Sequence, residues 1–283
     1  GGQDELVFDG GSFVVDKNGE FIYVAPQFKE DFFTFDIELE VTDNVSESSL
    51  SLNEKNIKIE PLLSSNNLNK TESMYSALEL GLSDYVTKNK FEKVLVGLSG
   101  GIDSALTATI ACDALSPENV IGVAMPSKYN PDSSLEDAKK LAKNLGIEIK
   151  EINIEDTVEN FRELLGNNTD EKLANVVDEN IQSRVRGNIL MALSNQLGAM
   201  VVSTGNKSEM AVGYATLYGD LVGGFALLKD VYKADVYNLA NYRNSISDVI
   251  PKSTILKEPS AELSNDQFDS DTLPDYDTLD KII

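Results

Sequence analysis

The sequence predicts an α/β fold in which a doubly wound parallel sheet follows a short N-terminal β segment. Along most of the chain, short apolar runs alternate with helical stretches of about 10 to 15 residues, and the runs end in polar or glycine-rich loops. This alternation favours parallel strands with right-handed crossovers and helices on both faces of the sheet. Such sheets bind ligands beyond the carboxyl ends of their strands, so a functional site is expected in the loops there.

The N-terminal segment shows strand patterning. Four strands are expected there: Leu6–Phe8, Ser12–Val15, Phe21–Ala25 and Phe33–Glu40. The turn between the second and third strands contains Asn18-Gly19, a pair that supplies the positive φ of a hairpin. A hairpin of this size cannot form a stable core alone. Residues 1–40 are therefore interpreted as the end of a second domain, and residues 41–68, rich in Ser, Asn and Glu, as a linker.

Residues 69–283 carry the alternating pattern and are predicted to form the main domain. After a helix whose apolar face starts at Met74, the expected elements are strand Val94–Leu98, helix Ala105–Leu115, strand Val120–Met125, helix Ser133–Leu145, strand Ile147–Ile154, helix Leu173–Leu197 and strand Ala199–Ser203. Ser133 and Glu136 have the spacing of a capping box, and Gly146 is placed to end that helix. The loops after the first, second and fourth of these strands should converge on one crevice.

Composition narrows the chemistry. The net charge of −23 argues against a nucleic-acid partner, because phosphate backbones are bound by basic surfaces. No apolar run approaches the roughly 18 residues of a membrane span and no signal peptide opens the chain, so a cytoplasmic protein without a membrane partner is expected. The absence of histidine excludes Ser-His-Asp and Cys-His catalysis. The single cysteine, Cys112, lies among apolar residues of a predicted helix and is interpreted as a core thiol.

A glycine-rich loop joins the first strand of the main domain to its helix. It comprises Gly97, Leu98, Ser99, Gly100, Gly101, Ile102, Asp103 and Ser104. Its glycines let the backbone approach a phosphate, and the helix N-terminus offers free N–H groups. It lacks the Gly-Lys-Ser/Thr ending of a Walker A loop. Asp103 would repel phosphate unless a cation lay between them, which makes it a candidate Mg²⁺ ligand. A tight turn capped by Ser and Asp explains the composition equally well.

A second polar run, Ser203–Glu209, follows the fourth strand. Thr204 offers a hydroxyl to nucleotide oxygens, Lys207 adds a positive charge and Glu209 is a second acidic candidate for the cation. The alternative is a polar loop with a helix cap. On the long helix before this strand, Asn180 and Arg184 share a face. A surface helix with ion pairs is the alternative for the arginine.

The loop Ser-Gly-Gly-x-Asp-Ser after a buried strand resembles the pyrophosphate loop of the ATP pyrophosphatases, enzymes with a Rossmann-like sheet of the adenine nucleotide alpha hydrolase type. On this motif alone the member stays open among NAD, GMP, asparagine and argininosuccinate synthetases and tRNA-thiolating enzymes. The run from Ser203 to Gly224 and the signature Lys257-Glu-Pro-Ser-Ala-Glu-Leu263 resemble the glutamine-dependent NAD synthetases. The signatures at Asn206–Glu209 and Lys257–Leu263 argue against the alternative of GMP synthetase.

The resemblance implies MgATP-dependent adenylation of the nicotinate carboxylate of deamido-NAD, followed by attack of ammonia to give NAD and AMP. Mg²⁺ would be the cofactor and ATP a co-substrate, and no side chain would act as nucleophile. By resemblance, the ATP-binding residues are the loop Gly97–Ser104 with Thr204, Lys233 and Ser260. The substrate-binding residues are Asn180, Arg184, Arg186, Glu209, Tyr218, Gly219 and Asp220, and the metal ligands are Asp103 and Glu209.

Residues 1–12 resemble the end of the nitrilase-like glutaminase domain of these enzymes, whose catalytic cysteine lies upstream. The resemblance therefore implies a C-terminally truncated synthetase domain without glutaminase activity, for which free ammonia replaces glutamine. It also implies a homo-oligomer, a dimer or larger. A non-catalytic fragment that binds adenine nucleotides is the alternative from another functional class.

Overall fold

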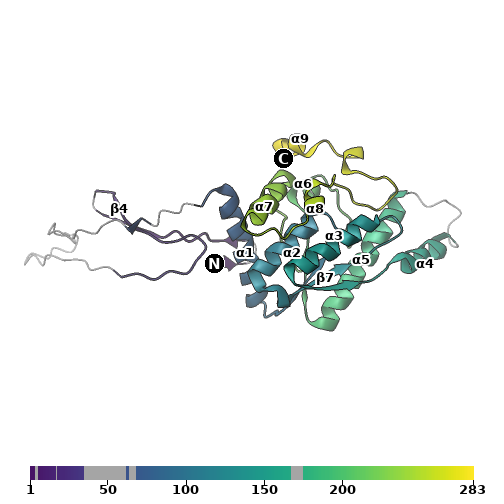
Figure 1. Ribbon diagram of the computed structural model, residues 1–283, viewed down its shortest axis with the longest axis horizontal. Coiled ribbons are helices and arrows are strands. Elements are labelled where there is room, and N and C mark those ends of the chain that lie inside the picture. The colour runs from purple at the N-terminus through teal and green to yellow at the C-terminus, as the bar shows by residue number, and fades with distance from the viewer. Residues whose placement is uncertain (4–5, 17, 35–61, 64–67, 167–174) are drawn as a thin grey trace, which may run out of the picture. The chain divides into compact units, whose positions relative to one another are not determined.

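The computed structural model describes residues 1–3, 6–16, 18–34, 62–63, 68–166 and 175–283 (Figure 1). They belong to two compact units. One comprises Gly1 and Phe8–Asn69, and the other comprises Gly2–Val7 and Lys70–Ile283. The assignment of residues 1–40 to the remnant of a second domain stays a prediction.

The smaller unit contains a three-stranded sheet with the order β3 (Phe13–Val15), β4 (Phe21–Val24), β5 (Leu62–Leu63). Strands β3 and β4 are antiparallel. The turn that joins them has Gly19 at φ 85°, and its Asp16 carboxylate accepts hydrogen bonds from the N–H groups of Asn18 and Glu20. The hairpin prediction is therefore confirmed. Of the predicted strand Phe33–Glu40, the first two residues lie outside any strand, and the rest lies outside the described residues, as does most of the predicted linker.

The larger unit is built on a five-stranded parallel sheet with the order β10-β9-β6-β7-β8. Its strands are β6 (Val94–Gly97), β7 (Val120–Ala124), β8 (Glu148–Glu151), β9 (Met200–Ser203) and β10 (Phe225–Ala226). From β6 the chain moves outward through β7 to β8, then returns to β9 on the other side of β6. The predicted doubly wound fold is confirmed, and its switch point lies between β6 and β9.

Helices precede, connect and follow these strands. They are α1 (Lys70–Lys88), α2 (Ile102–Leu115), α3 (Asp132–Leu145), α4 (Glu155–Gly166), α5 (Asn175–Leu197), α6 (Lys207–Ala211), α7 (Lys233–Ile246), α8 (Lys252–Leu256) and α9 (Tyr276–Ile282), with 3-10 turns at Pro117–Asn119 and Asp269–Asp271. A short antiparallel ribbon, β1 (Gly2–Gln3) with β2 (Leu6–Val7), packs on α1. In the part of the chain that the structure describes, no helix has the length and apolar character needed to span a bilayer.

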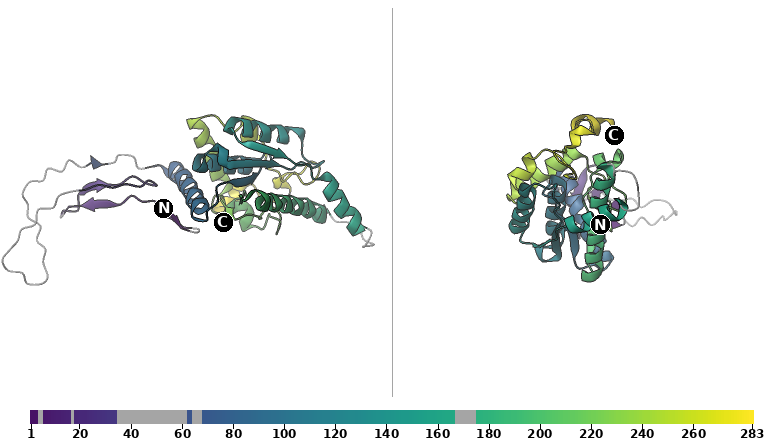
Figure 2. Two further views of the ribbon diagram at one scale, coloured as in Figure 1. Left: turned by 90° about the horizontal axis from the view of Figure 1, so that it is seen from below. Right: turned by 90° about the vertical axis from the view of Figure 1, so that its right-hand side faces the viewer.

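Two hydrophobic cores cover the two faces of the sheet because successive side chains of a strand point to opposite sides. Val94 and Val96 of β6 lie in the core formed with α1, α2, α3 and α7. Leu95, between them, lies in the core formed with α4 and α5. Figure 2 shows the long helix α5 on the side of the sheet away from α3. Packing in these two cores holds the strands in place, and therefore also the loops that follow their carboxyl ends.

Four details differ from the sequence-based expectations, among them strand β10, which was not expected. The predicted capping box at Ser133 is wrong, because α3 begins one residue earlier, after Pro131 in extended conformation, and no side chain caps it. The third strand is shorter than Ile147–Ile154. Helix α4 was not expected at all. Gly146 does end α3, in the left-handed conformation at φ 74°.

Candidate active site

A cavity of about 280 Å³ lies at the carboxyl ends of β6, β7 and β9. The loops after these three strands line it, which confirms that they converge on one crevice. The predicted site residues that line it are Gly97, Leu98, Ser99, Gly101, Ile102, Asp103, Ser104, Arg186, Thr204, Glu209, Gly219, Asp220, Lys233 and Ser260. Four other predicted residues, Gly100, Asn180, Arg184 and Tyr218, are not part of the lining.

The glycine-rich loop is shaped by its own hydroxyl groups. Ser104 Oγ donates to the Gly101 carbonyl at 3.0 Å and lies 3.1 Å from Ser99 Oγ, which in turn accepts from the Gly101 N–H at 3.2 Å. Gly100 has φ 83°, and a Cβ built on it would lie only 2.3 Å from the Ser134 carbonyl oxygen in α3. The loop therefore packs directly on the first turn of α3, and no side chain caps the N-terminus of α2. Its free N–H groups suit an anion.

The buried ammonium group of Lys233 joins the two predicted acidic ligands. Lys233 is 2% exposed, and its Nζ lies 2.5 Å from Asp103 Oδ2 and 3.2 Å from Glu209 Oε1. Asn206 completes the cluster, since its Nδ2 donates to Asp103 Oδ1 at 2.8 Å and its side chain forms a capping box with Glu209 at the start of α6. Residues that follow β6 and β9 are thus joined at the switch point.

The cluster places two carboxylates against one ammonium group in buried surroundings. Burial and the neighbouring Asp103 raise the pKa of Glu209 to about 7. Burial works to lower the pKa of Lys233, but the two carboxylates outweigh it and raise that pKa. Two carboxylates that already share one cation fit Mg²⁺, which is commonly held by one or two protein carboxylates plus substrate phosphates. Among the described residues, no group of three acidic, His or Cys side chains could hold a metal by itself.

The C-terminal helix α9 supports the position of Lys233. The carboxylate of Asp280 accepts from the Ala234 N–H at 3.0 Å and from the hydroxyl of Ser208. That hydroxyl accepts in turn from the Lys233 N–H at 2.9 Å. Asp280 and Ser208 together therefore satisfy the N–H groups of Ala234 and Lys233 at the N-terminus of α7, where the lysine begins the helix.

Of the three predicted polar residues of α5, one lines the cavity and two contact a neighbouring loop. Arg186 is half-buried and donates to the Met125 carbonyl at 3.1 Å and to Asn130 Oδ1 at 3.1 Å. Burial lowers its pKa to about 10. Arg184 is exposed and its Nε donates to the Leu217 carbonyl at 3.2 Å. Asn180 accepts from the Thr216 hydroxyl. Arg186 therefore lines the cavity, whereas Arg184 and Asn180 hold the loop that follows Thr216.

That loop, Thr216–Asp220, lies against α5. The Asp220 N–H donates to Ser183 Oγ at 3.0 Å, and Asp220 Oδ1 accepts from the Thr216 N–H at 2.7 Å. Burial raises the pKa of Asp220. A Cβ on Gly219 would lie 2.3 Å from Ser183 Oγ, so the close approach requires glycine. Tyr218 is 75% exposed at φ 64° and does not line the cavity.

Segment 257–263 forms another wall, and its contacts were not anticipated. Glu262 Oε1 accepts from Ser134 Oγ at 2.7 Å and pairs with Lys257 Nζ at 2.5 Å, while its Oε2 accepts from Asn130 Nδ2 at 3.0 Å. Ser260 Oγ instead donates to the Gln267 carbonyl, within its own loop. The motif drew attention to this segment, but its partners Asn130 and Ser134 follow the second strand and carried no signal of their own.

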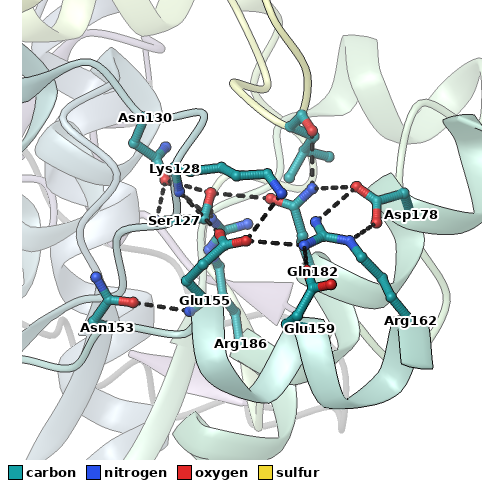
Figure 3. Close-up of polar contacts among 11 residues, drawn as sticks. Ser127, Lys128, Asn130, Asn153, Glu155, Glu159, Arg162, Asp178, Gln182 and Arg186 are labelled. Atoms are coloured by element: carbon teal, nitrogen blue, oxygen red, sulfur yellow. Dashed lines mark hydrogen bonds and ion pairs between the residues drawn. The ribbon is translucent and has the colours of Figure 1, made fainter. Parts of the chain in front are cut away.

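A buried amide ties three parts of the site together (Figure 3). Gln182 of α5 is fully buried; its Oε1 accepts from Ser127 Oγ at 3.0 Å, and its Nε2 donates to the Leu263 carbonyl at 2.9 Å and to Asp178 Oδ2 at 3.3 Å. Arg162 of α4 holds Asp178 with two hydrogen bonds of 2.5 and 3.0 Å. The unexpected helix α4 therefore braces the wall of the cavity.

Comparison with known proteins gives a consistent picture. The family model described as NAD synthase matches residues 74–283. The glutamine-dependent NAD(+) synthetase of Thermotoga maritima is 48% identical over 303 residues, an alignment that covers 100% of this chain and 52% of that protein. The chain thus spans about half the length of the curated relatives it matches.

Solved structures agree. The glutamine-dependent NAD+ synthetase from Acinetobacter baumannii, in complex with ADP, aligns with a TM-score of 0.78 and 42% identity over 100% of this chain and 48% of that one. An NMN synthetase from Francisella tularensis aligns with a TM-score of 0.69 and 30% identity over 76% of this chain and 86% of that one.

Proposed function

The chain belongs to the NAD synthase family, and we propose that it catalyses the ATP-dependent amidation of deamido-NAD to NAD. The observation that carries this proposal is the joining of Asp103, Glu209 and Lys233 beside a glycine-rich loop at the switch point of the sheet. This arrangement places two acidic side chains, an ammonium group and free N–H groups side by side. Together they would bind the triphosphate of ATP next to the carboxylate of deamido-NAD.

The chemistry would proceed in two steps. In the first, a carboxylate oxygen of the nicotinate ring attacks the α-phosphorus of ATP, and pyrophosphate leaves. In the second, the nitrogen lone pair of ammonia attacks the activated carbonyl carbon, AMP leaves with the bonding electrons, and the nitrogen gives up a proton. The chain contributes by orienting the reactants and by stabilising the charge of pyrophosphate.

Each group of the pocket has a role in this scheme. The loop Ser99–Ser104 and Lys233 would hold the phosphates, Thr204 and Ser260 would orient the nucleotide, and Arg186 would approach the dinucleotide. Mg²⁺, held by Asp103 and Glu209, would neutralise phosphate charge when bound. Asn180, Arg184 and Tyr218 would act by holding the edge of the substrate site.

Ammonia would be supplied from outside the residues of this chain. Its single cysteine, Cys112, is buried in α2, and burial, followed by the nearby Asp113, raises its pKa to about 12. A thiol in that state cannot act as the nucleophile of glutamine hydrolysis. We therefore expect ammonium, and not glutamine, to support the reaction of this chain.

The test is NAD formation by the purified chain with MgATP, deamido-NAD and ammonium, run beside glutamine and beside nicotinate mononucleotide as the alternative acceptor. Asp103→Asn should lower the rate about a hundredfold. Asp156→Asn, on the exposed face of α4, is the matched control and should leave the rate unchanged. Nucleotide binding without turnover of either acceptor would favour the alternative of a non-catalytic binding fragment, and faster amidation of the mononucleotide would reassign the substrate.

A further inference from the structure

We propose that Lys257 is a phosphate-binding residue of this pocket, an inference that rests on the proposed function. Lys257 lines the cavity, and its side chain retains 25% exposure. Its ammonium group pairs with Glu262 at 2.5 Å and contacts the hydroxyl of Ser134. The lysine therefore presents a partly accessible positive charge to a pocket expected to take a triphosphate.

The position of Ser134 places this charge beside the glycine-rich loop. The Ser134 carbonyl lies so close to Gly100 that a Cβ there would approach it to 2.3 Å. The side chain of the same serine contacts the Lys257 ammonium. A phosphate seated on the N–H groups of the loop would thus lie within a short movement of the flexible lysine side chain.

The other basic groups of the lining are less able to reach a new anion. In the described part of the chain these are Arg186 and Lys233. Lys233 is almost fully buried between two carboxylates, and the half-buried Arg186 is hydrogen-bonded to the Met125 carbonyl and to Asn130. Lys257 has one carboxylate partner, and its side chain is 25% exposed against 3% for Lys233.

Release of Lys257 would not strand its partner. Glu262 would keep the hydrogen bonds from Ser134 Oγ at 2.7 Å and Asn130 Nδ2 at 3.0 Å. The carboxylate thus keeps two donors when the lysine turns to a phosphate, and the phosphate gives the ammonium group a new anionic partner. Glu262 has φ 51°, a left-handed conformation uncommon for a residue other than glycine, and its hydrogen bonds hold it there.

The experiment measures binding of MgATP, inorganic pyrophosphate and adenosine by calorimetry to the wild-type chain and to Lys257→Gln. Loss of a charge-assisted hydrogen bond should weaken MgATP and pyrophosphate about tenfold or more, while adenosine, which has no phosphate, should change less than about twofold. Lys252→Gln, an exposed lysine five residues earlier, is the matched control and should bind all three ligands as wild type does.

Equal weakening of all three ligands would overturn the inference, because it would show that Lys257 supports the pocket wall rather than a phosphate. Unchanged pyrophosphate binding would overturn it too. Glu262→Gln provides an independent arm: removal of the competing carboxylate charge should tighten pyrophosphate about threefold, and weaker binding would contradict the inference. A wild-type chain that binds neither MgATP nor pyrophosphate would instead refute the proposed function itself.

Discussion

Substitution of Gly100 by alanine tests the geometry of the glycine-rich loop. The residue has φ 83°, and a left-handed alanine costs roughly 1–2 kcal/mol. Its new Cβ would also lie 2.3 Å from the Ser134 carbonyl oxygen, and a backbone atom cannot rotate away as a side chain does. Overpacking of this kind typically costs about 1–3 kcal/mol. The variant should therefore lose about 2–5 kcal/mol of unfolding free energy and bind MgATP weakly.

Gly146→Ala separates the two contributions. Gly146 has nearly the same φ, 74°, but a Cβ there would meet nothing within 4 Å. It should lose only the conformational part, roughly 1–2 kcal/mol, and keep its nucleotide affinity. Urea unfolding of both variants gives the two free energies, and calorimetric titration with MgATP gives the affinities. Gly100→Ala with the stability of Gly146→Ala and wild-type affinity would refute the packing of the loop on α3.

Three further predictions concern buried groups. Gln182→Met keeps the side-chain length but leaves buried partners unpaired, so urea unfolding should show a loss of about 2–4 kcal/mol, and a loss below about 1 kcal/mol would contradict the network. Because burial and Asp103 raise the pKa of Glu209 from 4.5 to about 7, the wild-type chain without Mg²⁺ should lose stability relative to Glu209→Gln as the pH rises through this window. If the unfolding free energies of the two proteins changed in parallel with pH, the raised pKa of Glu209 would be contradicted. Cys112, with its pKa raised to about 12 by burial, should resist an aromatic disulfide reagent at pH 8 until urea unfolds the chain.

The buried strands β6, β7 and β9 were predictable from local pattern because each is a short apolar run that ends in a loop of distinct composition, whereas β10, only two residues long, was not predicted. Helix α4 could have been predicted, because Val158, Phe161 and Leu165 recur at the spacing of one helical face. A start signal was present, since the side chain of Asn153 accepts from the Glu155 N–H and two acidic residues follow. Both the apolar spacing and the start signal of α4 are therefore present in the sequence.

For the site, the sequence indicates which loops matter but not which side chains pair. Ser127 and Gln182 are 55 residues apart, and their hydrogen bond depends on how α5 crosses the loop after β7. Such contacts arise from the packing of elements, and nothing in the sequence pairs these two residues with each other. Arg186 illustrates the same limit: its charge was predicted at the site, but not its bonds to that loop.

The pairing of Asp103 with Glu209 is partly predictable, because the strand order of the sheet brings the two residues together. Asp103 follows β6 and Glu209 follows β9, and these strands are neighbours only because the chain returns past its first strand. Once that order is accepted, two acidic residues that follow adjacent carboxyl ends must lie close together, and a cation is needed between them. Lys233, which is 130 residues from Asp103, supplies that cation, because Asp280 and Ser208 fix the N-terminus of α7 where the lysine begins it. The strand order thus requires a cation at this point, and the packing of α9 on α7 determines which residue provides it.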